Sequence, residues 1–210
     1  LYNFCTVTLS ARYFDIIKDR LYIFAPASKE RRSAQTALYK IADTLARLLS
    51  PILVFTTDEI WENLPVQTIQ SVHLAEFPQV SNMKDAELTA RWERLFAMRE
   101  DVLKTLETAR GEKLIGSSLE AKVVLTASGE NFDLLERYAA ELRYIFIVSQ
   151  VELKRASEGE QLRVQVAKAD GEKCERCWNY STHVGESERY PTVCERCLAA
   201  LTEIENNLNV

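Results

Sequence analysis

The sequence predicts a mainly α protein, in which a helical bundle is followed by a small α+β domain and a short C-terminal module that contains four cysteines. Apolar residues recur at steps of three and four over roughly the first 60 residues, which is the pattern of amphipathic helices. After about residue 120 the apolar period shortens towards the alternation of strands, and two pairs of cysteines follow. The expected domains are residues 1–80, 81–170 and 171–210.

The N-terminal domain is expected to contain two long helices and a short one. The first runs from about residue 3 and ends before Pro26, and the second ends before Pro51, because proline cannot continue a helix. Thr56 and Glu59 have the spacing of a capping box ahead of the short third helix. The apolar stripes of the two long helices are Phe4, Val7, Ala11, Phe14, Ile17 and Leu21, then Ala34, Leu38, Ile41, Leu45 and Leu48.

The middle domain is expected to combine helices with strands, and glycines mark its turns. Apolar residues at helical spacing, including Leu95, Val102 and Leu106, predict a long helix. Shorter apolar runs beyond it predict strands on either side of a second helix. The expected helices are residues 84–109 and 132–142, the expected strands are residues 121–126, 145–151 and 162–167, and the turns are at Gly129, Gly159 and Gly171.

Four conspicuous side chains in these helices have a structural explanation. Trp61 and Trp92 lie on apolar stripes, so we expect both rings to pack in a core. Asp58 and Glu59 are better explained as charges near a helix N-terminus than as an acid and base pair.

The composition is that of an ordinary globular protein. Of 210 residues, 47% are hydrophobic and 27% are charged, which differs from disordered and collagen-like chains. No apolar run approaches the roughly 18 residues of a membrane span, and the chain opens on Leu1 without a signal peptide. We therefore expect a cytoplasmic piece of a longer protein with no membrane partner.

Charge is distributed unevenly along the chain. The net charge is −5, yet residues 1–50 contain eight Lys and Arg against four Asp and Glu. Lys29, Arg31 and Arg32 cluster at the first turn of the second expected helix, where the helix dipole adds to their positive potential. A polyanionic partner should therefore meet the N-terminal part of the chain first.

Four of the five cysteines have the spacing of a zinc site. Cys174 and Cys177 form one C-x2-C pair, Cys194 and Cys197 form a second, and sixteen residues separate the pairs. Two such turns supply the tetrahedral set of thiolates that zinc prefers. Four protein ligands leave no open position, so we expect one structural Zn²⁺. Redox chemistry by a single pair is a weaker alternative, and Cys5 is expected to be a small buried hydrophobe.

The expected zinc finger is too acidic to hold phosphate by charge. Residues 171–210 contain four Lys and Arg against seven Asp and Glu, and the thiolates add negative charge. If the finger meets nucleic acid, Arg176 and Trp178 are the means, because they can hydrogen-bond to or stack on unpaired bases. Equally open is that Trp178 packs over the zinc turn and Arg176 is a solvated side chain. His183 is expected near the surface or behind the ligands, because four sulfurs complete the metal's shell.

Five stretches of the sequence together resemble one family. They resemble the C-terminal part of bacterial isoleucyl-tRNA synthetases, and the resemblance covers essentially the whole chain. The first three stretches also recur in the related valine and leucine enzymes, whereas the fourth and the four-cysteine finger favour the isoleucine enzyme. In order, the stretches are KDRLY at 18–22, RRSAQT at 31–36, SPILVFTTDEIW at 50–61, IGSSLEA at 115–121 and KCERCW at 173–178.

This resemblance implies a helical anticodon-binding domain, a small α+β junction domain and a zinc finger, which together grip the anticodon stem and loop of isoleucine tRNA. The HIGH and KMSKS signatures of class I catalytic domains are absent from the sequence. No catalytic residues are therefore expected, and ATP and Mg²⁺ would belong to a catalytic part outside this chain. The implied partners are isoleucine tRNA and the catalytic body of the same ligase, and the expected state is a monomer.

Five residues are expected to contact RNA. Arg176 and Trp178 match the positions of the KCERCW motif that contact anticodon-loop nucleotides in the family. Arg31, Arg32 and Gln35 begin the RRSAQT helix, where arginine can pair with phosphate and glutamine with a base edge or a ribose hydroxyl.

Two other functions are compatible with the finger taken alone. The same type of finger, with the same sixteen residues between its cysteine pairs, forms the C-terminal end of formamidopyrimidine-DNA glycosylases. These enzymes need an N-terminal proline nucleophile followed by glutamate. The present chain begins with Leu1, Tyr2 and Asn3. The second alternative is a zinc-ribbon module that binds only protein.

Overall fold

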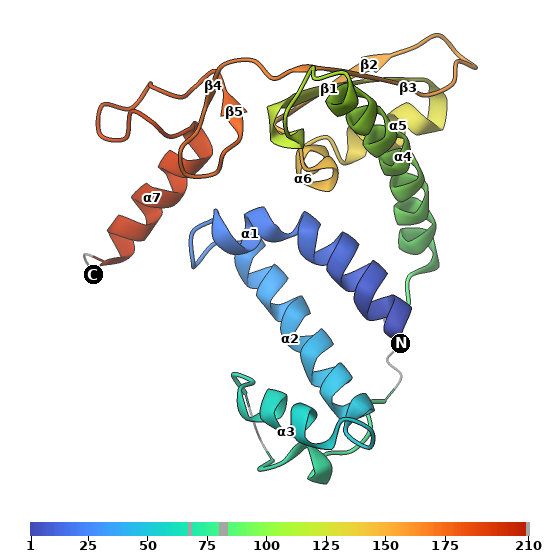
Figure 1. Cartoon of the computed structure of the whole chain (residues 1–210), viewed down its shortest axis with the longest axis vertical. Helices are drawn as coiled ribbons and strands as arrows, with labels where there is room; N and C mark the ends of the chain where they lie inside the picture. The colour runs from blue at the N-terminus through green and yellow to red at the C-terminus, as the bar shows by residue number, and fades with distance from the viewer. Residues whose placement is uncertain (67–68, 80–83, 209–210) are drawn as a thin grey trace. The chain divides into compact units, whose positions relative to one another are not determined.

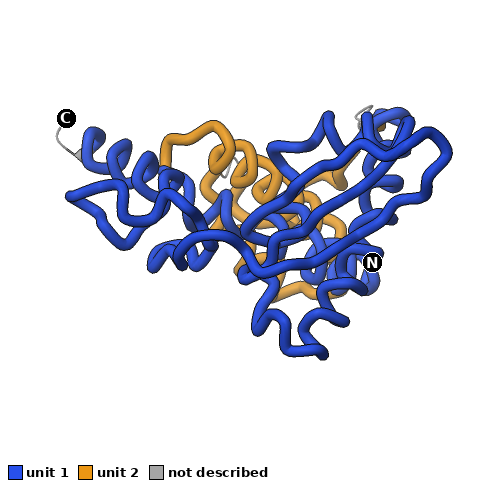
Figure 2. Tube along the Cα trace, turned by 90° about the horizontal axis from the view of Figure 1, so that it is seen from above, with its two compact units in different colours: residues 1–25, 85–210 blue, residues 26–84 orange. Residues whose placement is uncertain are grey.

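The chain forms two compact units. The computed structural model describes residues 1–66, 69–79 and 84–208. One unit combines Leu1–Ala25 with Asp85–Val210, and the other is Pro26–Lys84 (Figure 2). The division into domains at 1–80, 81–170 and 171–210 stays a prediction. Within the described ranges, no helix combines the length and the apolar character that crossing a bilayer requires.

In the unit of residues 26–84, the described residues form two helices and a short 3-10 turn. Helix α2 (Lys29–Leu49) and helix α3 (Val54–Glu62) are joined through Pro51, and the turn η2 (Val72–Leu74) follows. The hydroxyl of Ser28 caps α2 by accepting the N–H of Arg31 at 3.3 Å. Trp61 is buried with Ala46 and Val72, which confirms its expected packing in a core.

The start of α3 differs from the expected capping box. The N-cap is Leu53 rather than Thr56, and no side chain caps this end. The carboxylate of Asp58 points instead to η2, where it accepts hydrogen bonds from the Ser71 hydroxyl at 2.7 Å and from the Val72 N–H at 3.1 Å. These bonds lower the pKa of Asp58, with the Ser71 bond contributing most. Asp58 therefore anchors the segment after α3. Residue spacing along a helix does not predict this contact, because its partners lie outside the helix.

The first 25 residues form two helical segments rather than one. A π-helix, η1 (Phe4–Phe14), is followed by α1 (Lys18–Tyr22). Leu9 and Ile17 are buried, whereas Phe4 and Val7 of the expected stripe are exposed. A π-helix bonds residue i to i+5, so a stripe spaced for an α-helix does not stay on one of its faces.

The rest of this unit begins with a long helix packed against a three-stranded sheet. Helix α4 (Ala86–Gly111) starts where Asp85 accepts the N–H of Leu88 at 2.9 Å. Strand β1 (Ala121–Ala127) lies in the centre, parallel to β2 (Gln150–Arg155) and antiparallel to β3 (Arg163–Lys168). A short 3-10 turn, η3 (Ser118–Glu120), precedes β1, and helices α4, α5 (Gly129–Arg137) and α6 (Leu142–Phe146) cover the sheet (Figure 1).

The core of this sheet takes one side chain in two from β1, because alternate residues of a strand face the same side. Val123 and Leu125 are completely buried, together with Leu95 of α4 and Phe146 of α6. Trp92 packs half-buried at the edge of the same core, as its place on the stripe predicts.

The segment between β1 and β2 corrects the expected boundaries. The helix expected at 132–142 is divided into α5 and α6, and the strand expected at 145–151 begins only at Gln150. Leu142, Ile145 and Phe146 are buried at helical spacing, and a short apolar run does not distinguish a helix from a strand. Helix α6 ends at Ile147, which has left-handed backbone angles.

Residues 171–208 form a hairpin and a helix. Strands β4 (Glu172–Lys173) and β5 (Tyr180–Ser181) are antiparallel, and helix α7 (Glu195–Leu208) follows. Gly171 has φ of 86°, and a Cβ atom there would lie 2.3 Å from the carbonyl oxygen of Ser181. Only glycine fits this position, which confirms the expected turn at the entry to the cysteine module.

Candidate metal centre and nucleic-acid interface

The four cysteines of the C-terminal module come together as one buried cluster. The sulfurs of Cys174, Cys177, Cys194 and Cys197 all lie within 4.8 Å of one another. The Sγ atoms of Cys177 and Cys194 are 3.6 Å apart, far longer than a disulfide. A tetrahedral zinc with bonds of about 2.3 Å requires sulfurs about 3.8 Å apart. The cluster therefore fits a structural Zn²⁺ held by four thiolates.

Two turns of the backbone present these sulfurs. The first cysteine turn (174–177) is closed by the N–H of Trp178, which donates to the Cys174 carbonyl at 2.8 Å. The second cysteine turn (194–197) opens α7, and the N–H of Cys194 donates to the Cys174 sulfur at 3.3 Å. Such donors stabilise negative charge on ligand sulfurs.

Cysteine side chains in this cluster lie close enough together to shift one another's pKa values. Hydrogen bonding to Cys194 raises the pKa of Cys177 to about 11. The pKa of Cys194 lies far below its usual range, because Cys177 and Cys197 donate hydrogen bonds to its sulfur. Zinc binds thiolates, so loading the cluster displaces protons and becomes weaker in acid.

His183 is a surface residue, as expected. Its Nδ1 atom lies 2.8 Å from the Glu186 carboxylate, and both side chains are largely exposed. This carboxylate raises the pKa of His183, mainly through the hydrogen bond.

The structure places Arg176 between the zinc cluster and the segment after α1. Its Nη1 atom donates to the Ile23 carbonyl at 2.8 Å and approaches the Cys197 sulfur at 3.5 Å. The side chain is half-buried. Arg176 is thus neither a purely solvated residue nor one directed only outward.

Arg196 occupies the equivalent place in the second cysteine turn, and the sequence analysis missed it. Nη1 of Arg196 lies 3.0 Å from the Asp19 carboxylate and 3.1 Å from the Tyr144 hydroxyl, and Nη2 lies 3.6 Å from the Cys177 sulfur. Burial opposes its charge, but Tyr144 and Asp19 outweigh that cost, so the pKa of Arg196 is raised. The available signal was a repeat, since both turns have the sequence Cys-Glu-Arg-Cys.

Trp178 is held in an unusual conformation directly after the first cysteine turn. Its φ is 63°, a left-handed value that bulky residues rarely adopt. The residue is 62% exposed, so much of its surface is open to solvent. The Lys173 ammonium lies 5.6 Å from the ring centroid. Backbone strain of this kind costs about 1–3 kcal/mol and is typical of functional positions.

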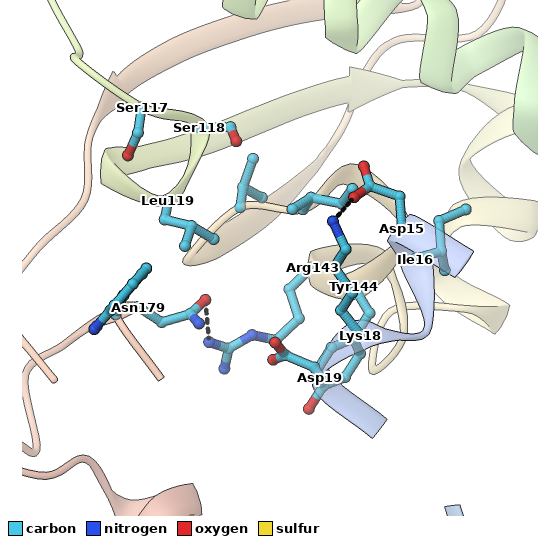
Figure 3. Close-up of a pocket in the computed structure, with 13 residues that line it drawn as sticks. Asp15, Ile16, Lys18, Asp19, Ser117, Ser118, Leu119, Arg143, Tyr144 and Asn179 are labelled. Carbon is cyan, nitrogen blue, oxygen red and sulfur yellow. Dashed lines mark hydrogen bonds and ion pairs between the residues drawn. The ribbon is translucent and has the colours of Figure 1, made fainter. Parts of the chain in front are cut away.

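Trp178 is one of the residues that line a pocket of about 450 Å³. Figure 3 shows this pocket, with Lys18, Arg143 and Asn179 at its wall. The Lys18 ammonium is 2.6 Å from the Asp15 carboxylate on one side, and Arg143 donates to Asn179 at 3.4 Å on another. The pocket thus brings together side chains from the KDRLY stretch, the IGSSLEA stretch and the finger, together with Tyr144 of α6. Aromatic, hydroxyl and charged groups of this kind suit a polar planar ligand.

The remaining predicted RNA contacts belong to the unit of residues 26–84. Arg31 is half-buried, whereas Arg32 and Gln35, which lie about one turn apart on α2, are exposed. Arg32 and Gln35 line one hollow of about 560 Å³ together with Tyr39, whose hydroxyl donates to the Val66 carbonyl at 3.3 Å. The structure therefore groups Arg32 with Gln35, as their spacing of three residues on a helix predicts.

Comparison with known proteins gives two family matches. Residues 1–125 match the family described as the anticodon-binding domain of tRNA ligase. Residues 171–200 match the zinc finger found in FPG and IleRS.

Curated relatives extend the similarity to nearly the whole chain. An isoleucine–tRNA ligase of Syntrophotalea carbinolica is 50% identical over 97% of this chain, and one of Carboxydothermus hydrogenoformans is 49% identical over 98%. One of Geobacter sulfurreducens is 45% identical over 95%. The chain spans only 22–23% of the length of these relatives.

Proposed function

Because the chain belongs to the family of anticodon-binding domains of tRNA ligases, we propose that it recognises the anticodon stem and loop of isoleucine tRNA. The relatives named isoleucine–tRNA ligase support the choice of tRNA. In this proposal the catalytic body of the same ligase attaches isoleucine with ATP and Mg²⁺. The ligase acts as a monomer in the cytoplasm, and the residues of this chain bind tRNA without taking part in the chemistry.

The observation that carries the proposal is the exposed ring of Trp178. The backbone of Trp178, directly after the first cysteine turn, has a left-handed φ of 63°, and the residue is 62% exposed. An aromatic face in this position can stack on a base that the anticodon loop leaves unpaired. The adjacent pocket offers the hydroxyl groups of Ser117 and Ser118 as polar groups for the edge of such a base.

The helical unit supplies the complementary contacts. Arg31 and Arg32 at the start of α2 would pair with backbone phosphates, and Gln35 would reach a base edge or a ribose hydroxyl. The acidic finger cannot attract phosphate by net charge, so this electrostatic contribution falls to the N-terminal helices. A direct contact between Arg176 and RNA stays a prediction, to be separated from its role at the zinc cluster.

Binding of the 210-residue chain, loaded with zinc, to isoleucine tRNA tests the proposal. We expect weak binding that falls steeply as salt rises, because phosphate contacts release counterions. A tRNA of the same body with an exchanged anticodon should bind more weakly. Equal affinity for the two would contradict recognition of the anticodon, and binding that does not change with salt would contradict the role of Arg31 and Arg32.

Neither alternative function gains support from the structure. The zinc-finger family is shared with FPG proteins, but residues 1–125 match the anticodon-binding family. We therefore propose no DNA glycosylase activity and no role limited to protein binding.

A further inference from the structure

The two cysteine turns are related by a repeated sequence and by crossed contacts. Each has the sequence Cys-Glu-Arg-Cys, at 174–177 and at 194–197. Arg176 of the first turn lies 3.5 Å from the sulfur of Cys197, and Arg196 of the second lies 3.6 Å from the sulfur of Cys177. Each arginine thus approaches the last cysteine of the opposite turn.

The same two guanidinium groups also bind one short segment outside the finger. Arg176 donates to the carbonyl of Ile23, and Arg196 forms an ion pair with Asp19 at 3.0 Å. The Arg196 side chain is only 16% exposed and that of Asp19 only 27%, and Ile23 packs against the cysteine cluster. Residues separated by about 150 to 180 positions in the sequence therefore meet through two arginines.

We propose that Arg176 and Arg196 are positioning residues that couple the zinc cluster to residues 19–23, so that metal binding and docking of the finger on this segment are one linked event. The proposal rests on the zinc site and is independent of RNA recognition. It assigns to Arg176 a role other than reading a base.

The physical basis is the charge on the cluster. Four thiolates around Zn²⁺ carry net negative charge, and N–H donors beyond the ligands stabilise it. Arginine suits this place because its planar fork presents several donors in fixed directions. One group can therefore satisfy a sulfur on one side and an Asp19 carboxylate or Ile23 carbonyl on the other. Binding free energies linked in this way are reciprocal, so docking must strengthen zinc binding as much as zinc strengthens docking.

Hydrogen exchange of the whole 210-residue chain tests the linkage without any mutation. The amides of Ile23 and Phe24 both donate to the Asp19 carbonyl, at 2.9 and 3.3 Å, and so report on the docked segment. Removing zinc with a chelator should accelerate their exchange, while amides of β1 paired with β2 should keep their protection. Unchanged exchange at Ile23 and Phe24 after zinc removal would overturn the proposal.

Substitutions of the arginines test the assignment of residues. Arg176→Gln and Arg196→Gln should each weaken zinc binding about 10- to 100-fold, the usual loss for groups that support metal ligands. Arg189→Gln is the matched control, because Arg189 pairs with Glu205 within the finger at 2.7 Å and is 70% exposed. We expect Arg189→Gln to bind zinc as the unsubstituted chain does.

Cobalt(II) in place of zinc gives a readout that general destabilisation does not produce. Loss of an N–H donor to a thiolate should move the sulfur-to-cobalt charge-transfer band to longer wavelength in Arg176→Gln and Arg196→Gln, but not in Arg189→Gln. Lysine variants cover the case in which a glutamine variant fails to fold. A point charge cannot span both contacts, so Arg176→Lys and Arg196→Lys should fall between the glutamine variants and the original chain.

Wild-type zinc affinity and cobalt spectra in all four variants would overturn the proposal. If Arg176→Gln then weakened only tRNA binding, Arg176 would be a direct RNA contact.

Discussion

At the scale of single residues, the backbone of the finger requires glycine more strictly at position 171 than at position 185. Gly171 and Gly185 both have positive φ, 86° and 97°. A Cβ at Gly171 would collide with the backbone at 2.3 Å from the Ser181 oxygen, whereas at Gly185 the nearest such atom is 3.9 Å away. A substitution at Gly185 therefore measures backbone strain alone, whereas one at Gly171 adds a steric collision.

We predict that Gly171→Ala destabilises the zinc-loaded finger by more than about 2 kcal/mol, because strain at a positive φ adds to a backbone clash. Gly185→Ala should cost only about 1 kcal/mol. Thermal unfolding followed by zinc release measures both. Equal effects of the two substitutions would show that the close approach at Gly171 relaxes without cost.

Asp58 gives a pH dependence whose sign follows from its contacts. The Ser71 hydroxyl and the Val72 N–H hold its folded pKa below the unfolded value of about 3.9. Asp58 therefore contributes stability that is present above pH 4 and is lost as pH falls through the folded pKa.

We predict that Asp58→Asn lowers the stability of the helical unit at neutral pH and flattens its loss of stability in acid below about pH 4. Glu59→Gln, at the exposed neighbouring position, is the control. Urea unfolding at several pH values provides the measurement. An acid dependence that stays the same in Asp58→Asn would assign it to other carboxylates.

At the scale of elements, the sequence predicted the helices and strands in which buried residues recur at regular helical or alternating spacing. Helices α2 and α4 and strands β1 and β3 lie within a few residues of their expected bounds. Helix α6 was missed because Leu142, Ile145 and Phe146 form an apolar run that suits a buried strand equally well. The stripe through Phe4 and Val7 failed because a π-helix has a different residue spacing.

The residues of the metal site, like the helices and strands, were only partly predictable from the sequence. Cysteine spacing identified all four members of the sulfur cluster, because ligand geometry restricts C-x2-C turns. Spacing carries no information on Asp19 or Tyr144, which reach the finger only through tertiary packing. Arg196 was predictable in part. The repeated Cys-Glu-Arg-Cys sequence marks it, but its contacts with other elements cannot be read from the sequence.

At the scale of the whole molecule, zinc is expected to determine the stability of one part only. The sheet and α4 have their own core, whereas the finger's buried cluster is made almost entirely of the four cysteines. Segments this short depend on metal to fold, with apparent zinc binding free energies of about 10–16 kcal/mol in finger peptides.

We predict one zinc per chain, and we predict that a strong chelator unfolds residues 171–208 while the β2-β1-β3 sheet stays folded. Zinc affinity should also fall as pH is lowered, because protons compete for the thiolates. Metal analysis and hydrogen exchange measure these outcomes. A zinc content far from one, or a finger that remains protected without metal, would contradict the structural role of the cluster.

The central claim is that the zinc turn presents Trp178 to the anticodon loop, and tRNA binding by Trp178→Ala tests it most directly. Trp178→Phe, which keeps an aromatic face, is the matched variant, and metal analysis confirms that each variant retains zinc. We predict that Trp178→Ala weakens binding of isoleucine tRNA by about 1–3 kcal/mol, and that Trp178→Phe recovers much of this loss. Unchanged affinity in Trp178→Ala with zinc still bound would contradict the account.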